Sequence, residues 1–405
     1  MSRLLVISPT LAASRDGKLF LDKKFVEGMR FYSDRWPGPV GCLLHERTGT
    51  FAFGQYYDPA ELPFKVELLP EGRALGPREI AGYDTILCGG DGQAHLHLAE
   101  TCRRTGQALV FVIENIDETR RQMVMLDRTR SWPRRARALA SIQSGRRRRR
   151  QAFQAAGGIQ ANGHPAFAAY SPMNPDTMMF YDSRVSEDLL ATDADMAARS
   201  GRLATGAPLR LMHSGRLEPL KGSQDLIPIA RRLTARGIAF ELDIFGTGSL
   251  EAEIAAGIAA HGLQGKVRLN GPVDFRTELM PFARTRADIY LSCHRQSDPS
   301  CTYLENMGCG LAVVGYANRM WAALCEVSGA GWTAPLGKPE ALAEALAEAA
   351  TDRARLAACC TAARDFAAAH SFEREFDRRI AHLQAVGRPG RGKTQSDRTL
   401  GEPVG

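Results

Sequence analysis

The chain has 405 residues, of which 44% are apolar and 24% charged, with a formal net charge of +7. This length and composition indicate a soluble globular protein with room for two domains, and no apolar run approaches the roughly 18–20 residues of a membrane span. The nine cysteines lack metal-ligand spacing, which predicts reduced thiols in a cytoplasmic protein and no structural metal site.

Residues 1–192 predict one α/β domain. The apolar run Leu4–Ile7 predicts a first strand, followed by a polar loop and a helix with apolar residues at helical spacing. Two more strands are predicted at Thr85–Cys88 and Ala108–Ile113, ending in Gly-Gly-Asp and Glu-Asn. Repeated units of this kind imply a parallel sheet.

Residues 193–207 are rich in Asp, Ser, Gly and Ala without clear periodicity, which predicts an interdomain linker. Residues 208–387 predict a second, more regular α/β domain, with the option that its last helix packs back on the first domain. The tail 388–405 is predicted to be disordered. The predicted strands of the second domain are Leu209–His213, Phe240–Phe245, Val267–Leu269, Ile289–Cys293 and Ala312–Tyr316.

The first candidate site follows the strand that ends at His213. Gly215 lets the backbone turn, and two cations, Arg216 and Lys221, follow five residues apart. Ligands of open α/β sheets bind at the carboxyl ends of strands. An Arg and a Lys that converge there suit a diphosphate; the alternative is a solvated loop.

A second candidate is the pair Gly246 and Gly248, which stands between a strand and a helix. Glycines before a helix N-terminus permit close approach of a ligand. The alternative is a tight turn between strand and helix.

The third candidate, over residues 296–315, carries acids at Asp298 and Glu305 and then a small-residue turn. A buried carboxylate can accept two hydrogen bonds at once, as the vicinal hydroxyls of a ribose or hexose require. The backbone of the intervening residues lies near a predicted helix N-terminus and suits a diphosphate; it includes Ser300, Cys301 and Thr302.

These motifs resemble those of retaining glycosyltransferases of family 4 (glycosyl transferases group 1). The resemblance implies the GT-B fold, two Rossmann-like α/β domains facing across a central cleft. In the family's E-x7-E signature Glu305 matches the second glutamate, which holds the donor ribose. Ser297 stands at the position of the first, with Asp298 one residue later. Gly17 is the candidate for the family's glycine-rich phosphate loop.

Many family members carry a His after a middle strand of the first domain, near the reacting sugar. Here Glu114 and Asn115 stand at that strand end, and Asp91 ends the neighbouring strand as a candidate for acceptor contact. The alternative is structural: Asn115 or Asp117 caps the next helix, with Glu114 a solvated neighbour.

The resemblance implies metal-independent transfer of a hexose, with retention, from a UDP- or GDP-linked sugar. The acceptor is a hydroxyl of a glycan or a lipid-linked glycan, as in bacterial surface polysaccharide biosynthesis. Arg216, Lys221 and Glu114 are the predicted catalytic residues, with no cofactor besides the donor. The alternatives are a nucleotide-sugar epimerase on the same fold and a non-catalytic sugar-nucleotide-binding protein.

Residues 128–150 contain ten arginines and no acid, so the basic charge is concentrated in one segment. Its stretch Arg134–Arg150 is either a solvated face or a surface that docks on anionic lipid, which would place the enzyme on the inner face of the membrane. Nucleic acid is the least favoured partner, because no aromatic interleaving or nucleic-acid module accompanies the arginines.

Overall fold

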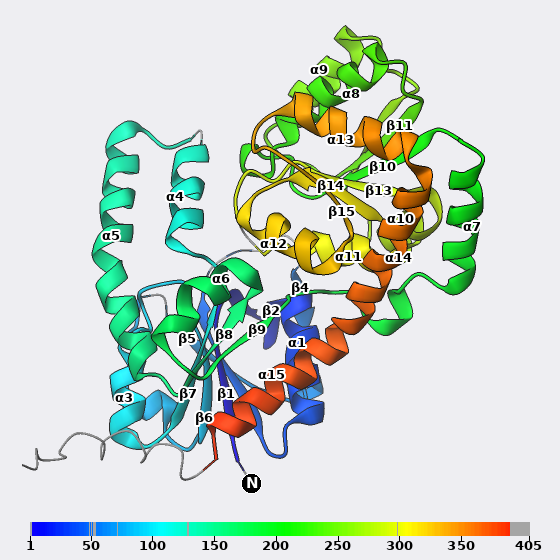
Figure 1. Cartoon of the computed structure of the whole chain (residues 1–405). Coiled ribbons are helices and arrows are strands. Elements are labelled where there is room, and N and C mark those ends of the chain that lie inside the picture. The colour runs from blue at the N-terminus through cyan, green and yellow to red at the C-terminus, as the bar shows by residue number, and fades with distance from the viewer. Residues whose placement is uncertain are drawn as a thin grey trace, which may run out of the picture.

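The computed structural model describes residues 2–388, except 48, 50, 52, 53, 71, 128 and 298. It consists of two α/β halves, each built on its own sheet (Figure 1). The predicted tail lies outside the described residues beyond Arg388, as does Asp298. Among the helices of the described part, none combines the length and apolar character needed to cross a membrane.

The first sheet has a parallel core in the order β5-β3-β1-β6-β7-β8-β9. The antiparallel strands β2 and β4 extend it beside the second half of β1. The strands are β1 (Leu4–Arg15), β2 (Lys18–Asp22), β3 (Val40–Glu46), β4 (Gly54–Tyr57), β5 (Lys65–Leu69), β6 (Thr85–Gly89), β7 (Ala108–Ile113), β8 (Gly158–Asn162) and β9 (Thr177–Phe180).

The first strand differs from its prediction. It continues from Ile7 to Arg15, because residues from Ala12 onward pair with β2 in a hairpin. Asp16 and Gly17 form the turn with φ of 51° and 74°. Positive φ at both central residues is what a type I′ hairpin turn requires.

Helices cover both faces of the first sheet. The hairpin of α4 and α5 projects beside the second half (Figure 1). The helices are α1 (Lys23–Arg35), α2 (Pro77–Ile80), α3 (Leu98–Thr105), α4 (Asp117–Leu126), α5 (Trp132–Ala155) and α6 (Gly163–Tyr170), with short helical turns η1 (Pro59–Glu61), η2 (Ser171–Met173) and η3 (Glu187–Leu189).

The second sheet is parallel throughout, in the order β12-β11-β10-β13-β14-β15. Its central strands are buried along their whole length, so both faces are covered by helices. The strands are β10 (Leu209–Ser214), β11 (Phe240–Phe245), β12 (Val267–Gly271), β13 (Ile289–Ser292), β14 (Ala312–Tyr316) and β15 (Gly331–Ala334).

The remaining helices surround this sheet and return to the first. They are α7 (Asp193–Ala204), α8 (Leu226–Ala235), α9 (Glu251–Ala260), α10 (Met280–Arg286), α11 (Thr302–Gly308), α12 (Arg319–Ser328), α13 (Pro339–Thr351), α14 (Arg353–Ala369) and α15 (Phe372–Val386), with short turns η4 (Pro219–Lys221), η5 (Ser223–Asp225) and η6 (Phe275–Leu279).

The prediction of an irregular linker over 193–207 is wrong in its local structure, because α7 fills most of it. Thr192 and Asp195 form a capping box at its start. The buried guanidinium of Arg199 donates to backbone carbonyls of the second half, including that of Cys309 at 3.0 Å. Helix α7 is thereby fixed to the second half.

The last helix, α15, crosses to the first half and packs on α1 and β9 (Figure 1). Phe376, Ile380 and Leu383 are buried in the same apolar cluster as Val26 and Met29 of α1. Full burial of such side chains contributes about 1.5–3 kcal/mol each. This helix therefore joins the two halves.

Candidate active site

The carboxyl ends of the strands in the two sheets face each other, and the loops after them meet. Thr119 in α4 donates from its hydroxyl to the carbonyl of Ser297 at 3.3 Å, and the Ser297 N–H donates to Gln122 Oε1 at 3.0 Å. After β8, a Cβ on Gly163 would stand 3.1 Å from Cβ of Pro299. The junction lies where open α/β sheets bind their ligands.

Ser297, the residue predicted at the position of the first signature glutamate, makes hydrogen bonds at this junction. It is buried, and besides the two bonds to α4 its hydroxyl accepts from the N–H of Arg319 at 3.2 Å. The position therefore serves contact between the halves. The neighbouring candidate, Asp298, lies outside the described residues.

Gly246 and Gly248 are explained by backbone packing. A Cβ on Gly246, whose φ is +126°, would meet the carbonyl oxygen of Gly215 at 1.9 Å. A Cβ on Gly248 would meet that of Leu217 at 2.5 Å. The two strand-end loops are thus pressed together, whereas Gly215, with φ of +138°, has open space around the position of its missing Cβ.

Lys221 is the last residue of η4, which follows β10. Its ammonium donates to the hydroxyl of Ser300 at 3.4 Å, and that hydroxyl lies 2.9 Å from Thr302 Oγ1. The Tyr290 hydroxyl, from β13, lies 3.1 Å from the same Thr302 oxygen. A cation, three hydroxyls and the start of α11 are therefore brought together, a set that suits a phosphate.

Arg216 extends from the loop after β10 and is exposed. Within the described part of the chain its guanidinium has no hydrogen-bond or ion-pair partner. The next acid, Glu218, is instead held by the N–H and hydroxyl of Ser249, at 3.0 and 2.6 Å, and these bonds lower its pKa. Arg216 is therefore available to a ligand.

Glu305 in α11 is a buried carboxylate of the second half. Burial raises its pKa, while the charges of Lys24 and Arg184 and a hydrogen bond from the Cys301 thiol oppose the rise. Burial likewise raises the pKa of that thiol. Glu305 thus lies among groups from both halves.

Lys24, at the start of α1, is a site residue that the sequence analysis does not identify. It forms an ion pair with Asp182, which follows β9. Burial would lower the pKa of Lys24, but Asp182, Cys301 and Glu305 outweigh this and raise it. In the sequence, Lys24 is marked only by its place at the start of a helix. Asp22 caps α1, and its carboxylate accepts a hydrogen bond from the Phe25 N–H at 3.0 Å.

Glu114, after β7, faces the same cluster from the first half. Burial among protein atoms and the carboxylates of Asp182 and Asp91 raise its pKa to about 7. Its side chain is nevertheless reached by solvent. Asn162 donates to it at 3.4 Å and accepts from the Asp182 N–H at 3.0 Å.

Asp91 stabilises the loop that follows β7. Its carboxylate accepts from the N–H groups of Glu114 and Asn115, at 3.0 and 2.9 Å, and pairs with Arg120 at 2.9 Å. It thereby holds the loop that presents Glu114. The alternative of a side-chain cap on α4 is wrong, because its N-cap is Ile116, which makes no side-chain cap bond.

Gly17 is accounted for by the hairpin turn between β1 and β2. A Cβ on it would have no neighbour within 4 Å. The turn itself requires the positive φ.

Residues 208–352 match the family described as Glycosyl transferases group 1. The second half of the chain carries a group 1 glycosyltransferase domain. Over 195 residues the chain is 32% identical to the amylovoran biosynthesis glycosyltransferase AmsK of Erwinia amylovora, which covers 45% of each protein. The chain thus spans less than half the length of this relative.

Solved structures resemble almost the whole chain. HepE from Anabaena, in complex with UDP-glucose, has a TM-score of 0.63 at 17% identity, covering 95% of this chain and all of HepE. Sucrose-phosphate synthase from Thermosynechococcus elongatus has a TM-score of 0.66 at 13% identity, covering 95% and 98% of the two chains. The group 1 domain is thus one half of a GT-B fold, and that predicted fold class is confirmed.

Proposed function

We propose that the protein is a metal-independent, retaining glycosyltransferase of family 4. It transfers a hexose from a UDP- or GDP-linked donor to a hydroxyl of a glycan or lipid-linked acceptor in surface polysaccharide biosynthesis. The observation that carries the proposal is the placement of Lys221 beside Ser300 and Thr302 at strand ends of the group 1 domain. AmsK, a polysaccharide biosynthesis glycosyltransferase, supports the biological setting.

In this proposal the second half binds the nucleotide sugar. Lys221 and the uncommitted Arg216 stabilise the diphosphate as negative charge develops on it, which lowers the barrier to departure. Glu305 accepts hydrogen bonds from the ribose hydroxyls, and such bonds also compensate its burial. Two protein cations supply the positive charge without a metal ion.

The first half orients the acceptor and the transferred hexose. Glu114, with its pKa near 7, holds or releases a proton close to neutrality and so suits contact with a sugar hydroxyl. Lys24 forms an ion pair with Asp182 beside it. The transition state is oxocarbenium-like, and the departing phosphate takes the acceptor proton on the same face.

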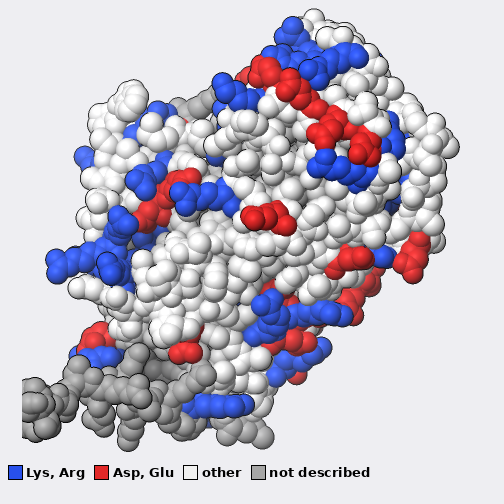
Figure 2. Space-filling view, in the orientation of Figure 1, with Lys and Arg blue, Asp and Glu red and all other residues white. Residues whose placement is uncertain are grey.

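The α4–α5 hairpin supports a further proposal, docking on the inner face of an anionic membrane. Met123, Met125 and Trp132 are among the exposed large apolar side chains, with Trp132 71% exposed. Figure 2 shows Lys and Arg side chains gathered along this flank. An exposed Trp beside arginines fits the lipid interface, and the nine free cysteines suit the reducing cytoplasm.

The test is thermal unfolding of the purified protein with UDP, GDP, ADP, TDP and their hexose conjugates. One nucleotide family is expected to raise Tm, because ligand that binds only the folded state stabilises it. Lys221→Ala should weaken that binding about 10–100-fold, the range expected for a charge-assisted contact. Exposed Lys338→Ala is the matched control.

No stabilisation by any nucleotide would refute the donor site. Turnover of the donor to an isomeric nucleotide sugar without an acceptor would instead favour the epimerase. Binding without turnover, given a broad set of acceptors, would favour the non-catalytic protein.

A further inference from the structure

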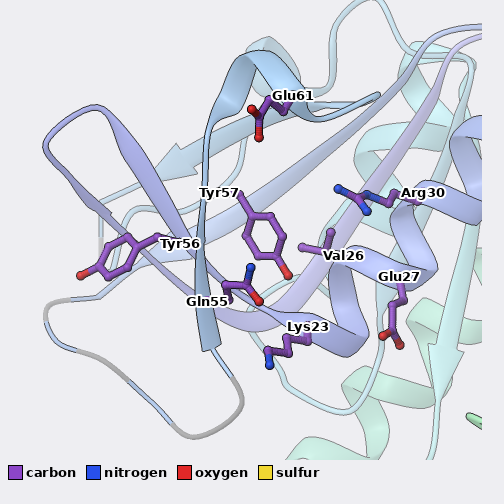
Figure 3. A pocket seen from close by; sticks show the side chains of 8 residues that line it. All are labelled: Lys23, Val26, Glu27, Arg30, Gln55, Tyr56, Tyr57 and Glu61. Carbon is purple, nitrogen blue, oxygen red and sulfur yellow. The ribbon is translucent and has the colours of Figure 1, made fainter. Parts of the chain in front are cut away.

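A separate pocket opens on the first half, between α1 and β4. Its volume is about 370 Å³. Figure 3 shows Lys23, Glu27 and Arg30 along α1 and Tyr57 standing between that helix and the strand. The Tyr56 ring points away on the other face of the strand, where it lies against Phe20.

Most polar side chains of this pocket make no hydrogen bond or ion pair with other residues in the described part of the chain. The side chains of Arg30, Gln55 and Glu61 are exposed, and within the described part of the chain none of them has a hydrogen-bond or ion-pair partner. Glu27 pairs only loosely with Arg184, at 3.9 Å. The pocket therefore presents hydrogen-bond donors and acceptors that are not paired with one another.

The balance of charges limits what this pocket takes. Lys23 and Arg30 are opposed by Glu27 and Glu61, so there is no excess of positive charge to hold a phosphate. Among the described residues of the lining, Val26 is the only one with an aliphatic side chain, too little for a lipid chain. A ring with several neutral hydroxyls uses both donors and acceptors, and its C–H face can lie on the amphipathic Tyr57 ring.

The pocket adjoins the candidate active site through α1. Lys24, which pairs with Asp182 in that site, follows Lys23 directly. Glu27 lies one helical turn further on, about 5 Å along the axis. Glu27 also pairs with Arg184, whose guanidinium lies over the Phe275 ring of the second half at 4.2 Å, so the pocket lies at the edge of the junction.

We infer that this pocket is a binding subsite for a neutral sugar unit of the acceptor glycan, next to the unit that receives the hexose. The inference rests on the proposed function and names the acceptor as a glycan of at least two sugars. Binding energy from such a remote unit can be used to orient the reacting hydroxyl.

The experiment is ligand-detected saturation-transfer NMR on the full-length protein with methyl glucosides, galactosides and mannosides and with maltose, lactose and cellobiose. At least one neutral sugar is expected to receive saturation. The signal should be lost in Tyr57→Ala and in Glu61→Gln. Tyr56→Ala, on the opposite face of the same strand, should keep it, and all variants should retain any stabilisation by nucleotides.

The outcomes separate the two ideas. Absence of a signal with every sugar, or a signal unchanged in both Tyr57→Ala and Glu61→Gln, overturns the subsite, whatever nucleotides do. Nucleotide stabilisation without sugar binding would leave the proposed function standing. Sugar binding that depends on Tyr57 and Glu61 without any nucleotide binding would support the pocket and refute the transferase. Because Glu61 is exposed, its variant tests the subsite even where Tyr57→Ala fails to fold.

Discussion

Replacing Glu114 by Gln should stabilise the protein at pH 8 much more than at pH 5. Glu114 titrates near pH 7 in the folded protein, above its ordinary value of 4.5. Between these values the folded state binds more protons than the unfolded state, so the free energy of unfolding falls as pH rises. The stability that protonated Glu114 contributes is complete below about 4.5 and lost by about 7. Gln cannot ionise and avoids that loss.

The size of the effect follows from the same pKa. A rise from 4.5 to about 7 would correspond to about 3 kcal/mol for a carboxyl shielded from water. The Glu114 side chain is exposed, so solvent and salt screen its repulsion by Asp182 and Asp91. We therefore expect Glu114→Gln to gain about 1 kcal/mol relative to wild type between pH 5 and pH 8.

Urea unfolding at the two pH values measures this difference. The comparison of wild type and variant at each pH cancels the contributions of all other titrating groups. Glu61→Gln, an exposed glutamate in the same half, is the control and should show no such dependence. Equal effects of Glu114→Gln at both pH values, or a greater loss at pH 8, would refute the reasoning.

Three further predictions concern other parts of the molecule. Asp91→Ala should cost about 2 kcal/mol, because its carboxylate bonds two N–H groups and a guanidinium; an unchanged urea midpoint would contradict this. Gly246→Ala should cost about 3 kcal/mol through strain and overlap, against about 1 for Gly237→Ala, which has positive φ but open space; equal losses of Tm would show that the clash is relieved. Trp132→Ala should lower sedimentation with anionic vesicles, while Val327→Ala, also exposed, should not; equal binding to neutral vesicles, or preference for RNA, would argue against lipid docking.

Parts of the fold could be read from local pattern alone. The strands Phe240–Phe245 and Ala312–Tyr316 agree with prediction to the residue, because buried parallel strands are short apolar runs between turns. Helix α7 is missing from the prediction, because the hydrogen bonds that fix it to the second half run from Arg199 to carbonyls far away along the chain. The predicted first strand is too short. The second part of β1 pairs with β2 through a hairpin turn that the residue pattern alone does not indicate.

The candidate site residues of the second half can be read from the sequence: a turn with Arg216 and Lys221, and Glu305 at the start of a helix near Ser300 and Thr302. Within each motif the residues are neighbours along the chain and so lie close in space, whereas the contact between Lys221 and Ser300 depends on the fold. Which residues of the first half meet them depends on how the chain folds. Lys24, Asp182 and Glu114 come from a helix and two strand ends far apart in the chain, and they meet because parallel strands deliver all their carboxyl ends to one edge.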